Sequence, residues 1–101
     1  MLYRINRIMH SGAKGKRGED RTDGIYPKRV GRVVSIADNY PVYEGYPALL
    51  IYVADADGNE YHGGLQTSRV VKMERTGNAI RLETANSIYE LVEILQQYIT
   101  I

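Results

Sequence analysis

The feature that most constrains the fold of this chain is a pair of segments, residues 69–75 and 79–84, in which apolar and charged residues alternate on either side of the turn Thr76-Gly77-Asn78. A period of two places successive side chains on opposite faces of a strand, and a glycine-containing turn between two such runs is typical of a β-hairpin. The side chains expected to point inward are Val71, Met73, Ile80 and Leu82. The chain is therefore expected to build its core on an antiparallel sheet.

Four other segments have the composition of strands. Residues 2–9 carry apolar side chains first on one alternation and then on the other, which predicts a strand that changes face midway or, alternatively, a short helix. Residues 28–36 alternate and predict a strand, and residues 48–54 are apolar at every position, which predicts a central strand covered on both faces. A turn at residues 55–59 leads into a short strand at 60–62. The residues expected to be mostly buried are Leu50, Ile51, Val53, Val71, Ile80, Leu82 and Leu91.

The carboxyl-terminal segment fits two structures. Residues 87–90 match a helix capping box, and apolar residues at helical spacing continue from there to Ile99. Residues 88–92 are nevertheless rich in β-favouring side chains, and residues 85–87 would form a tight turn that returns the chain along 79–84. We expect a strand at about 88–92 and a short helical turn or a frayed end beyond it.

One stretch of the sequence is similar to a known group of proteins. The string GNAIRLETANSIYEL (Gly77 to Leu91), which follows TSRVVKME (Thr67 to Glu74), resembles the last strands of small, uncharacterised bacterial proteins, many of them encoded on mobile elements. In those proteins a Thr-x-Asn-Ser-x-Tyr string closes a compact SH3-like β-barrel. The resemblance implies a mainly β domain, a small antiparallel SH3-like barrel of about five to seven strands. It contributes no catalytic or ligand residues.

Length and composition limit the class of protein. A chain of 101 residues, 44% apolar and 25% charged, suits one folded domain and excludes a largely disordered chain. The longest apolar run, residues 48–54, is too short to span a bilayer, and we expect no membrane partner. Arg4, Asn6 and Arg7 interrupt the amino-terminal apolar residues, so no secretory signal is predicted, and the absence of cysteine agrees with a reducing compartment. We expect a cytoplasmic protein.

No motif for enzyme chemistry is found in the sequence. Asp55-x-Asp57-x-Asn59 opens like a calcium loop, but Glu60 stands where that loop needs glycine, and a hairpin turn explains the same residues. The glycines between residues 12 and 18 lack the spacing of a nucleotide-binding loop. The two histidines and four serines have no catalytic context. We therefore expect no enzymatic activity, no cofactor and no bound metal.

The charges of the chain are divided by position. The first 32 residues hold nine Lys or Arg against three Asp or Glu, whereas the remaining 69 hold four against nine. Residues 11–24 contain four glycines and no large apolar side chain, which predicts a long loop carrying much of this positive charge. The cations expected to contact an anionic partner are Lys14, Lys16, Arg17, Arg21, Lys28 and Arg29.

The aromatic residues are all of one kind, nine tyrosines without phenylalanine or tryptophan. Tyr40, Tyr43 and Tyr46 recur every third residue in a loop that also holds Pro41 and Pro47. In an extended, polyproline-like backbone this period places the rings on one side, where they could stack on bases or fill the grooves of a partner. Alternatively, the loop folds back and its tyrosines cap an open end of the barrel.

These observations favour a non-enzymatic binding module. The first hypothesis is contact with nucleic acid through the basic loop, with the three loop tyrosines stacking on bases. The alternative is a regulatory or inhibitory module that binds an acidic protein surface. Basic loops serve both partners, and the sequence does not predict the oligomeric state.

Overall fold

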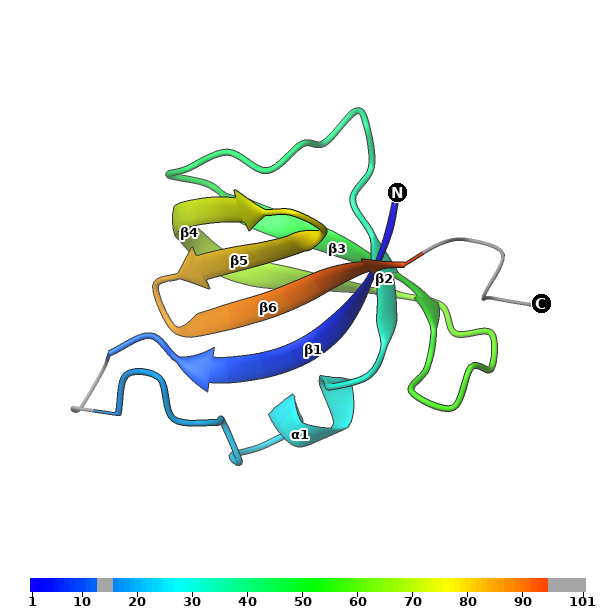
Figure 1. The fold of residues 1–101 in the computed structure, drawn as a ribbon, viewed down its shortest axis with the longest axis horizontal. Coiled ribbons are helices and arrows are strands. Elements are labelled where there is room, and N and C mark those ends of the chain that lie inside the picture. Colours follow the sequence, from blue (N-terminus) through cyan, green and yellow to red (C-terminus); the bar gives the residue numbers. More distant parts are fainter. Residues whose placement is uncertain (13–15, 95–101) are drawn as a thin grey trace.

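The computed structural model describes residues 1–12 and 16–94, and it is a closed barrel of six antiparallel strands. Each strand pairs with its neighbours in chain order, and the barrel closes where the first strand pairs with the last (Figure 1). The elements are β1 (Leu2–His10), α1 (Tyr26–Arg29), β2 (Val33–Ser35), β3 (Pro47–Ala54), β4 (Gly64–Thr76), β5 (Ala79–Thr84) and β6 (Ser87–Ile94). The predicted fold class, a small antiparallel barrel of mainly β structure, is confirmed.

The first strand changes face midway, as one interpretation of the sequence predicts. The register between β1 and β6 shifts between Ile5 and Arg7, which marks a β-bulge. Tyr3 and Ile5 are buried before the bulge, and Ile8 is buried after it, because the extra residue reverses the alternation. The alternative interpretation of this segment as a helix is wrong.

Two tight hairpins join the last three strands. Gly77 and Asn78 form the turn between β4 and β5, with Gly77 in the left-handed conformation at φ 59° that such a turn requires. Ala85 and Asn86 then turn the chain into β6, where the Thr84 hydroxyl accepts a hydrogen bond from the backbone N–H of Ser87. The helix alternative is therefore wrong as far as Ile94, and the predicted helical turn beyond it lies outside the described residues.

The core contains part of the set of residues that were expected to be buried. Leu50, Ile80, Leu82 and Leu91 are buried, and they belong to one cluster that fills the barrel. Ile51 and Val53 are only half-buried, because β3 buries alternate residues and the described part of the chain forms no second layer over its outer face. The prediction that β3 is covered on both sides is wrong.

Val71, expected inside, is 50% exposed. The register between β4 and β5 shifts between Val70 and Lys72, so this bulge turns Val70 inward in place of Val71. Met73 lies opposite buried Leu82 and so shares its face, but it is 37% exposed because this half of β4 pairs with β5 alone.

The segment predicted as one strand over residues 28–36 is a helical turn followed by a short strand. Pro27, the second residue of α1 (Tyr26–Arg29), has its φ fixed in the helical range, and proline is tolerated in the first turn of a helix. Only Val33–Ser35 pair as β2. Residues 60–62 also form no strand, since Glu60 makes only an isolated bridge with Ala54. Among the described residues, no helix is long and apolar enough to cross a membrane.

Candidate functional site

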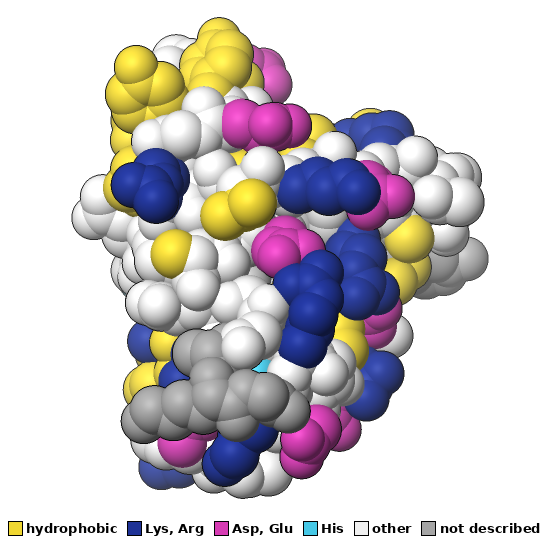
Figure 2. All heavy atoms as spheres, turned by 90° about the vertical axis from the view of Figure 1, so that its left-hand side faces the viewer, with side chains coloured by type: hydrophobic (Ala, Val, Ile, Leu, Met, Phe, Trp, Pro, Cys, Tyr) yellow, Lys and Arg dark blue, Asp and Glu magenta, His cyan; other side chains and the backbone are white. Residues whose placement is uncertain are grey.

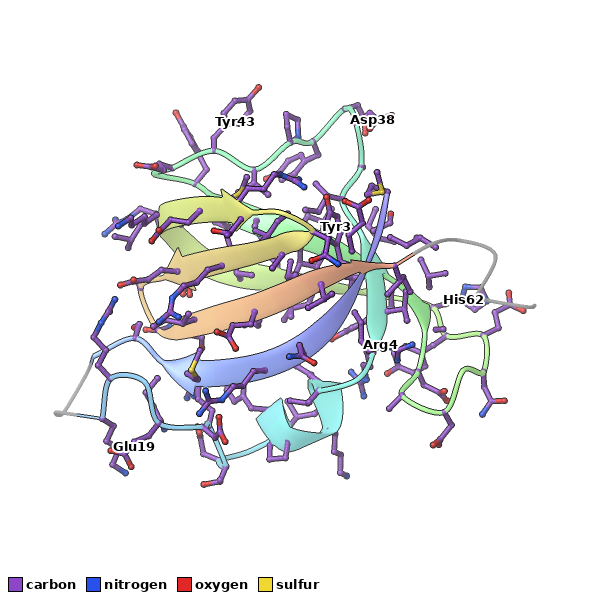
Figure 3. All side chains as sticks on the ribbon, in the orientation of Figure 1. Tyr3, Arg4, Glu19, Asp38, Tyr43 and His62 are labelled. Atoms are coloured by element: carbon purple, nitrogen blue, oxygen red, sulfur yellow. The ribbon has the colours of Figure 1, made fainter. Side chains whose placement is uncertain are left out.

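The predicted site residues lie in two separate regions. The cationic ones belong to the segment between β1 and β2, and the tyrosines belong to the loop between β2 and β3. Figure 3 shows Glu19, in the first segment, below the strands of the barrel and Tyr43, in the second, above them. The structure does not bring the two groups together. Lys14 lies outside the described residues.

Arg17 is held by the barrel. Its Nη1 and Nη2 donate hydrogen bonds to Glu83 Oε2 and Oε1 at 2.7 and 2.6 Å, and Nη1 also donates to the backbone carbonyl of Ser11. The hydrogen bonds from Arg17 hold the pKa of the Glu83 carboxyl below its usual range, although partial burial opposes them. Arg17 therefore fastens the loop to the outer face of β5, and its charge is already matched.

Replacing Glu83 by Gln should loosen this loop while the barrel stays folded. The amide of Gly18 donates to the carbonyl of His10, so its hydrogen-exchange rate reports whether the loop is closed. We expect the variant to exchange about two- to fivefold faster at Gly18, the scale of an exposed ion pair. Because the pKa of Glu83 is lowered by folding, the tether is complete above the ordinary value of 4.5 and is lost as the pH falls through the lower folded value. Equal exchange in the two proteins at neutral pH would refute the tether.

Arg21 makes the most side-chain interactions of the described cations in this segment. Its guanidinium donates to both carboxylate oxygens of Asp23 and to Ser87 Oγ at 2.9 Å, and it lies over the ring of Tyr26 at 3.8 Å from the centroid. The hydrogen bonds from Arg21 lower the pKa of Asp23. Arg7, in β1, donates a hydrogen bond from Nε to one carboxylate oxygen of Asp20, Oδ1. These arginines thus serve to pack the segment onto the barrel.

The helical turn α1 carries the other two predicted cations. The guanidinium of Arg29 also lies over the ring of Tyr26, at 5.0 Å from the centroid, and its Nε is buried without a hydrogen bond to the described residues. Lys28 is exposed. Tyr26 therefore contacts two guanidinium groups. No sequence pattern predicts this cluster, since Arg21, Tyr26 and Arg29 have no motif spacing.

One polar hollow of about 390 Å³ adjoins this segment. Lys16 and Arg21 contribute positive charge to it, and Asp23 contributes a negative one. Its other lining residues are His10, Thr22, Tyr26 and Asn86. A small anion would find donors here, with Asp23 opposing part of the attraction. Among the described residues, no group of three or more His, Asp or Glu side chains could hold a metal ion.

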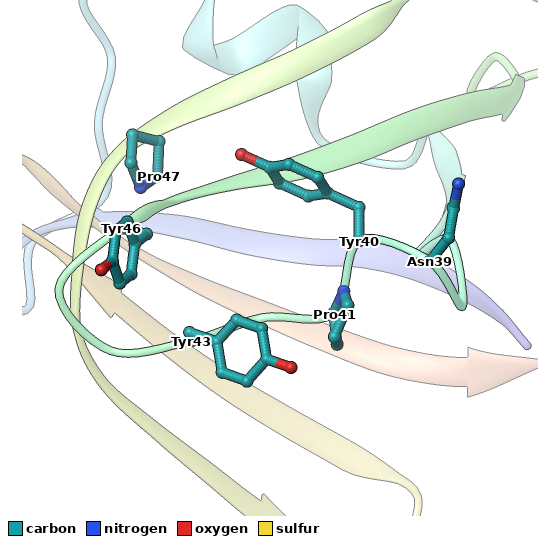
Figure 4. A pocket seen from close by; sticks show the side chains of 6 residues that line it. All are labelled: Asn39, Tyr40, Pro41, Tyr43, Tyr46 and Pro47. Atoms are coloured by element: carbon teal, nitrogen blue, oxygen red, sulfur yellow. The ribbon is translucent and has the colours of Figure 1, made fainter.

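The three loop tyrosines lie together around a second hollow, of about 470 Å³. Figure 4 shows the rings of Tyr40, Tyr43 and Tyr46 arranged with Pro41 and Pro47 around a common opening. The sixth lining residue is Asn39. Tyr40 is 45% exposed, Tyr43 62% and Tyr46 66%. We call this surface the tyrosine hollow. None of its lining residues is charged, and Asn39 and the tyrosine hydroxyls are its polar side-chain groups.

The loop that carries the hollow is anchored at both ends. Gly45 donates a backbone hydrogen bond to Val70, and Val70 donates one to Tyr46, so the loop's last residues continue the pairing of β3 with β4. Ile36 and Val42 pack against the core cluster. The expectation that tyrosines cap the barrel is therefore wrong. Ile36 and Val42 cover the core, which leaves the three rings displayed.

Charges and apolar side chains are separated on the surface. On the face that Figure 2 shows, hydrophobic side chains gather at the top, whereas Lys and Arg side chains lie lower and are interspersed with Asp and Glu. The ion pairs of this kind include Arg81 with Glu90 and Arg75 with Glu93. On the face shown, the described cations are therefore interspersed with carboxylates and form no continuous basic patch.

Comparison with protein-family models, with curated proteins and with solved structures found no match for this chain. The fold and the site thus define a small closed β-barrel that displays a tyrosine hollow on one loop and carries an ion-paired arginine segment on the opposite side.

Proposed function

We propose that this chain is a binding module that recognises a protein partner through the tyrosine hollow. The observation that supports it is the combination in one loop of three exposed rings, two prolines and no charged lining residue. Tyrosine offers a large, rigid contact area with little loss of conformational entropy, and aromatic residues are enriched in protein interfaces. Exposing three such rings costs the isolated protein apolar burial, which a partner would recover.

The chemistry of the hollow favours an extended segment rich in proline and aliphatic side chains. Aromatic-lined grooves bind polyproline II helices, because the rings contact the pyrrolidine faces and polar groups bond the peptide carbonyls. The Tyr40, Tyr43 and Tyr46 hydroxyls and the Asn39 amide are the donors available for those carbonyls. A charged segment would find no lining counter-ion there.

A second candidate is contact with nucleic acid through the polar hollow, and the meeting of Lys16 with Arg21 there favours it. The phosphate backbone binds through free cations, which release counter-ions on contact. Arg17 and Arg21 already bond Glu83 and Asp23, so the positive charge left for phosphates is smaller than the sequence predicts. The rings of the other loop lie on the opposite side of the barrel (Figure 3), so a strand held at this hollow would have to pass around the barrel before its bases reached them.

Replacing Tyr43 by Ala should abolish most of the binding to proline-rich peptides. The probe is a display library of proline-rich peptides of about ten residues, and the best binders are then measured by fluorescence anisotropy. The loss expected for a central aromatic side chain is about ten- to a hundredfold in affinity. Tyr43→Phe is the matched control, because it keeps the ring and removes only the hydroxyl, and it should lose much less.

The same assay distinguishes the two candidates. An oligothymidine of about 15 nucleotides, tested near 50 mM salt where electrostatic binding is strong, should show little affinity. The opposite outcome is that the oligothymidine binds, that Lys16→Ser weakens nucleic-acid binding at every sequence tested, and that Tyr43→Ala leaves this binding unchanged. Nucleic acid would then replace the protein partner as the function. Arg17→Ser is unsuitable for this purpose, since it also removes the bonds to Glu83.

A further inference from the structure

Half of β4 has an edge that pairs with no other described strand. β3 pairs with β4 only as far as Arg69, and the backbone bonds of Gly45 and Tyr46 extend this to Val70. From Val71 to Thr76, the described strands offer β4 a single partner, β5. A strand edge of this kind presents free N–H and C=O groups to any segment that can lie alongside it.

The register of the hairpin tells which groups face outward. In a two-residue hairpin the residues that flank the turn, here Thr76 and Ala79, exchange hydrogen bonds, and the pattern then alternates along the ladder. Glu74 and Lys72 therefore point their backbone groups toward β5. The N–H and C=O groups of Met73 and Arg75 point to the free edge.

There is room beside this edge. A cleft of about 300 Å³ lies between β4 and the loop that follows β2, with Met73 and Arg75 on one wall and Pro41 and Val42 on the other. Neighbouring strands lie about 4.8 Å apart, so an added strand would run along the mouth of this cleft. The exposed side chains of Val71 and Met73 would be covered by it.

The charged side chains of this edge are complementary to those of a second copy of the same edge. Lys72 and Glu74 lie on the outer face, on either side of Met73, where they form an ion pair of 3.2 Å within one chain while both side chains stay more than half exposed to a facing partner. When two such edges run antiparallel with Met73 opposite Met73, Lys72 of each chain faces the partner's Glu74. Opposite charges directly across a strand pair are favourable, whereas like charges there oppose pairing. This register also places the outward backbone groups of the two Met73 residues against each other.

From this geometry we infer that two copies of the chain pair through β4, antiparallel and centred on Met73, to form a twofold-symmetric dimer. The contact is isologous, so it closes after two copies and cannot continue as a fibre. The tyrosine hollow adjoins this cleft, since Pro41 lines both, but the backbone groups and charges that would form the strand pair belong to β4 and not to the hollow. Tests of one do not decide the other.

Charge reversal at the edge provides the test. Sedimentation velocity from about 10 µM to about 1 mM should show the wild-type protein passing from monomer to dimer. Lys72→Glu and Glu74→Lys should each weaken dimerisation by about tenfold or more, because like charges then face each other twice. An equal mixture of these two variants should dimerise again, since every facing pair in the mixed dimer is of opposite sign. Restored association in the mixture cannot come from misfolding.

A covalent probe tests the register. The chain has no cysteine, so Met73→Cys introduces a single thiol that can pair only with its equivalent in a second copy. Directly opposed, hydrogen-bonded residues lie about 5.5 Å apart at Cα, which a disulfide spans, so oxidation should give a covalent dimer. Arg81→Cys, on β5 away from the edge, is the matched control and should give little covalent dimer. A wild-type protein that remains monomeric to about 1 mM, or a dimer indifferent to both charge reversals, would overturn the inference.

Discussion

Replacing Leu82 by Ala should lower the free energy of unfolding by about 2–5 kcal/mol, the range for truncating a large aliphatic side chain in a packed core. Leu82 is fully buried in β5 and belongs to the cluster that fills the barrel. The opposed residue on β6 is buried Tyr89, so the lost methyl groups leave a cavity that a closed barrel cannot easily collapse. Urea denaturation followed by circular dichroism measures the change.

Two further truncations serve as controls for this result. Val71→Ala, at the bulge of β4, should change stability by less than about 0.5 kcal/mol, because half of this side chain is exposed. Ile51→Ala should fall between the two, since Ile51 is half-buried on the outer face of β3. If Val71→Ala costs as much as Leu82→Ala, the assignment of inward and outward faces in β4 is wrong.

Replacing Gly31 by Ala should destabilise the barrel by about 2–4 kcal/mol through two separate effects. Gly31 has φ 93°, a conformation that side chains with a Cβ rarely adopt. A Cβ atom at this position would also lie 2.8 Å from the Cβ of Ala56, in the turn after β3. The backbone of Gly31 additionally bonds Ile5 and Arg4, so it cannot move away freely.

Gly58→Ala separates these two effects. Gly58 has nearly the same backbone conformation, at φ 88°, but a Cβ added there would meet no atom within 4 Å among the described residues. Its substitution should therefore cost only the backbone strain, about 1–2 kcal/mol. Adding Ala56→Gly to the Gly31→Ala protein should restore the part of the stability that was lost to the close contact with the Cβ of Ala56. Equal costs at the two glycines, with no recovery, would mean that the turn moves aside without penalty.

Much of the fold follows from local sequence. The hairpin of β4 and β5 was predictable because alternation and turn chemistry agree over residues 69–84. The turn into β6 follows from the small residues Ala85, Asn86 and Ser87, and it decides between the strand and the helix for the segment up to Ile94. The bulge in β4 was not predictable in position. A bulge inserts one residue to suit the curvature of the whole barrel, so no local pattern distinguished Val70 from Val71 as the inward residue.

The candidate site was predictable only in part. The exposure of Tyr40, Tyr43 and Tyr46 agrees with the prediction that the rings are displayed, but the extended backbone predicted for this loop is wrong: turns at residues 37–40 and 43–46, the second with Gly45 at φ 93°, place the rings. The state of the arginines could not be predicted. Arg17 meets Glu83, 66 residues later in the chain, because the segment folds back onto the barrel beside β5. A count of charges along the sequence does not show that two residues so far apart form an ion pair.

The tyrosine hollow is the binding surface that we propose for this barrel. It is tested most directly by recording ¹⁵N-correlation spectra of the protein during titration with a selected proline-rich peptide and, separately, with an oligothymidine. We expect the peptide to shift the amide signals of residues 39–46, while those of His10, Lys16 and Asn86 stay in place, and we expect the oligothymidine to shift neither set. Shifts of the second set by the oligothymidine, with no response of residues 39–46 to any peptide, would contradict the proposal.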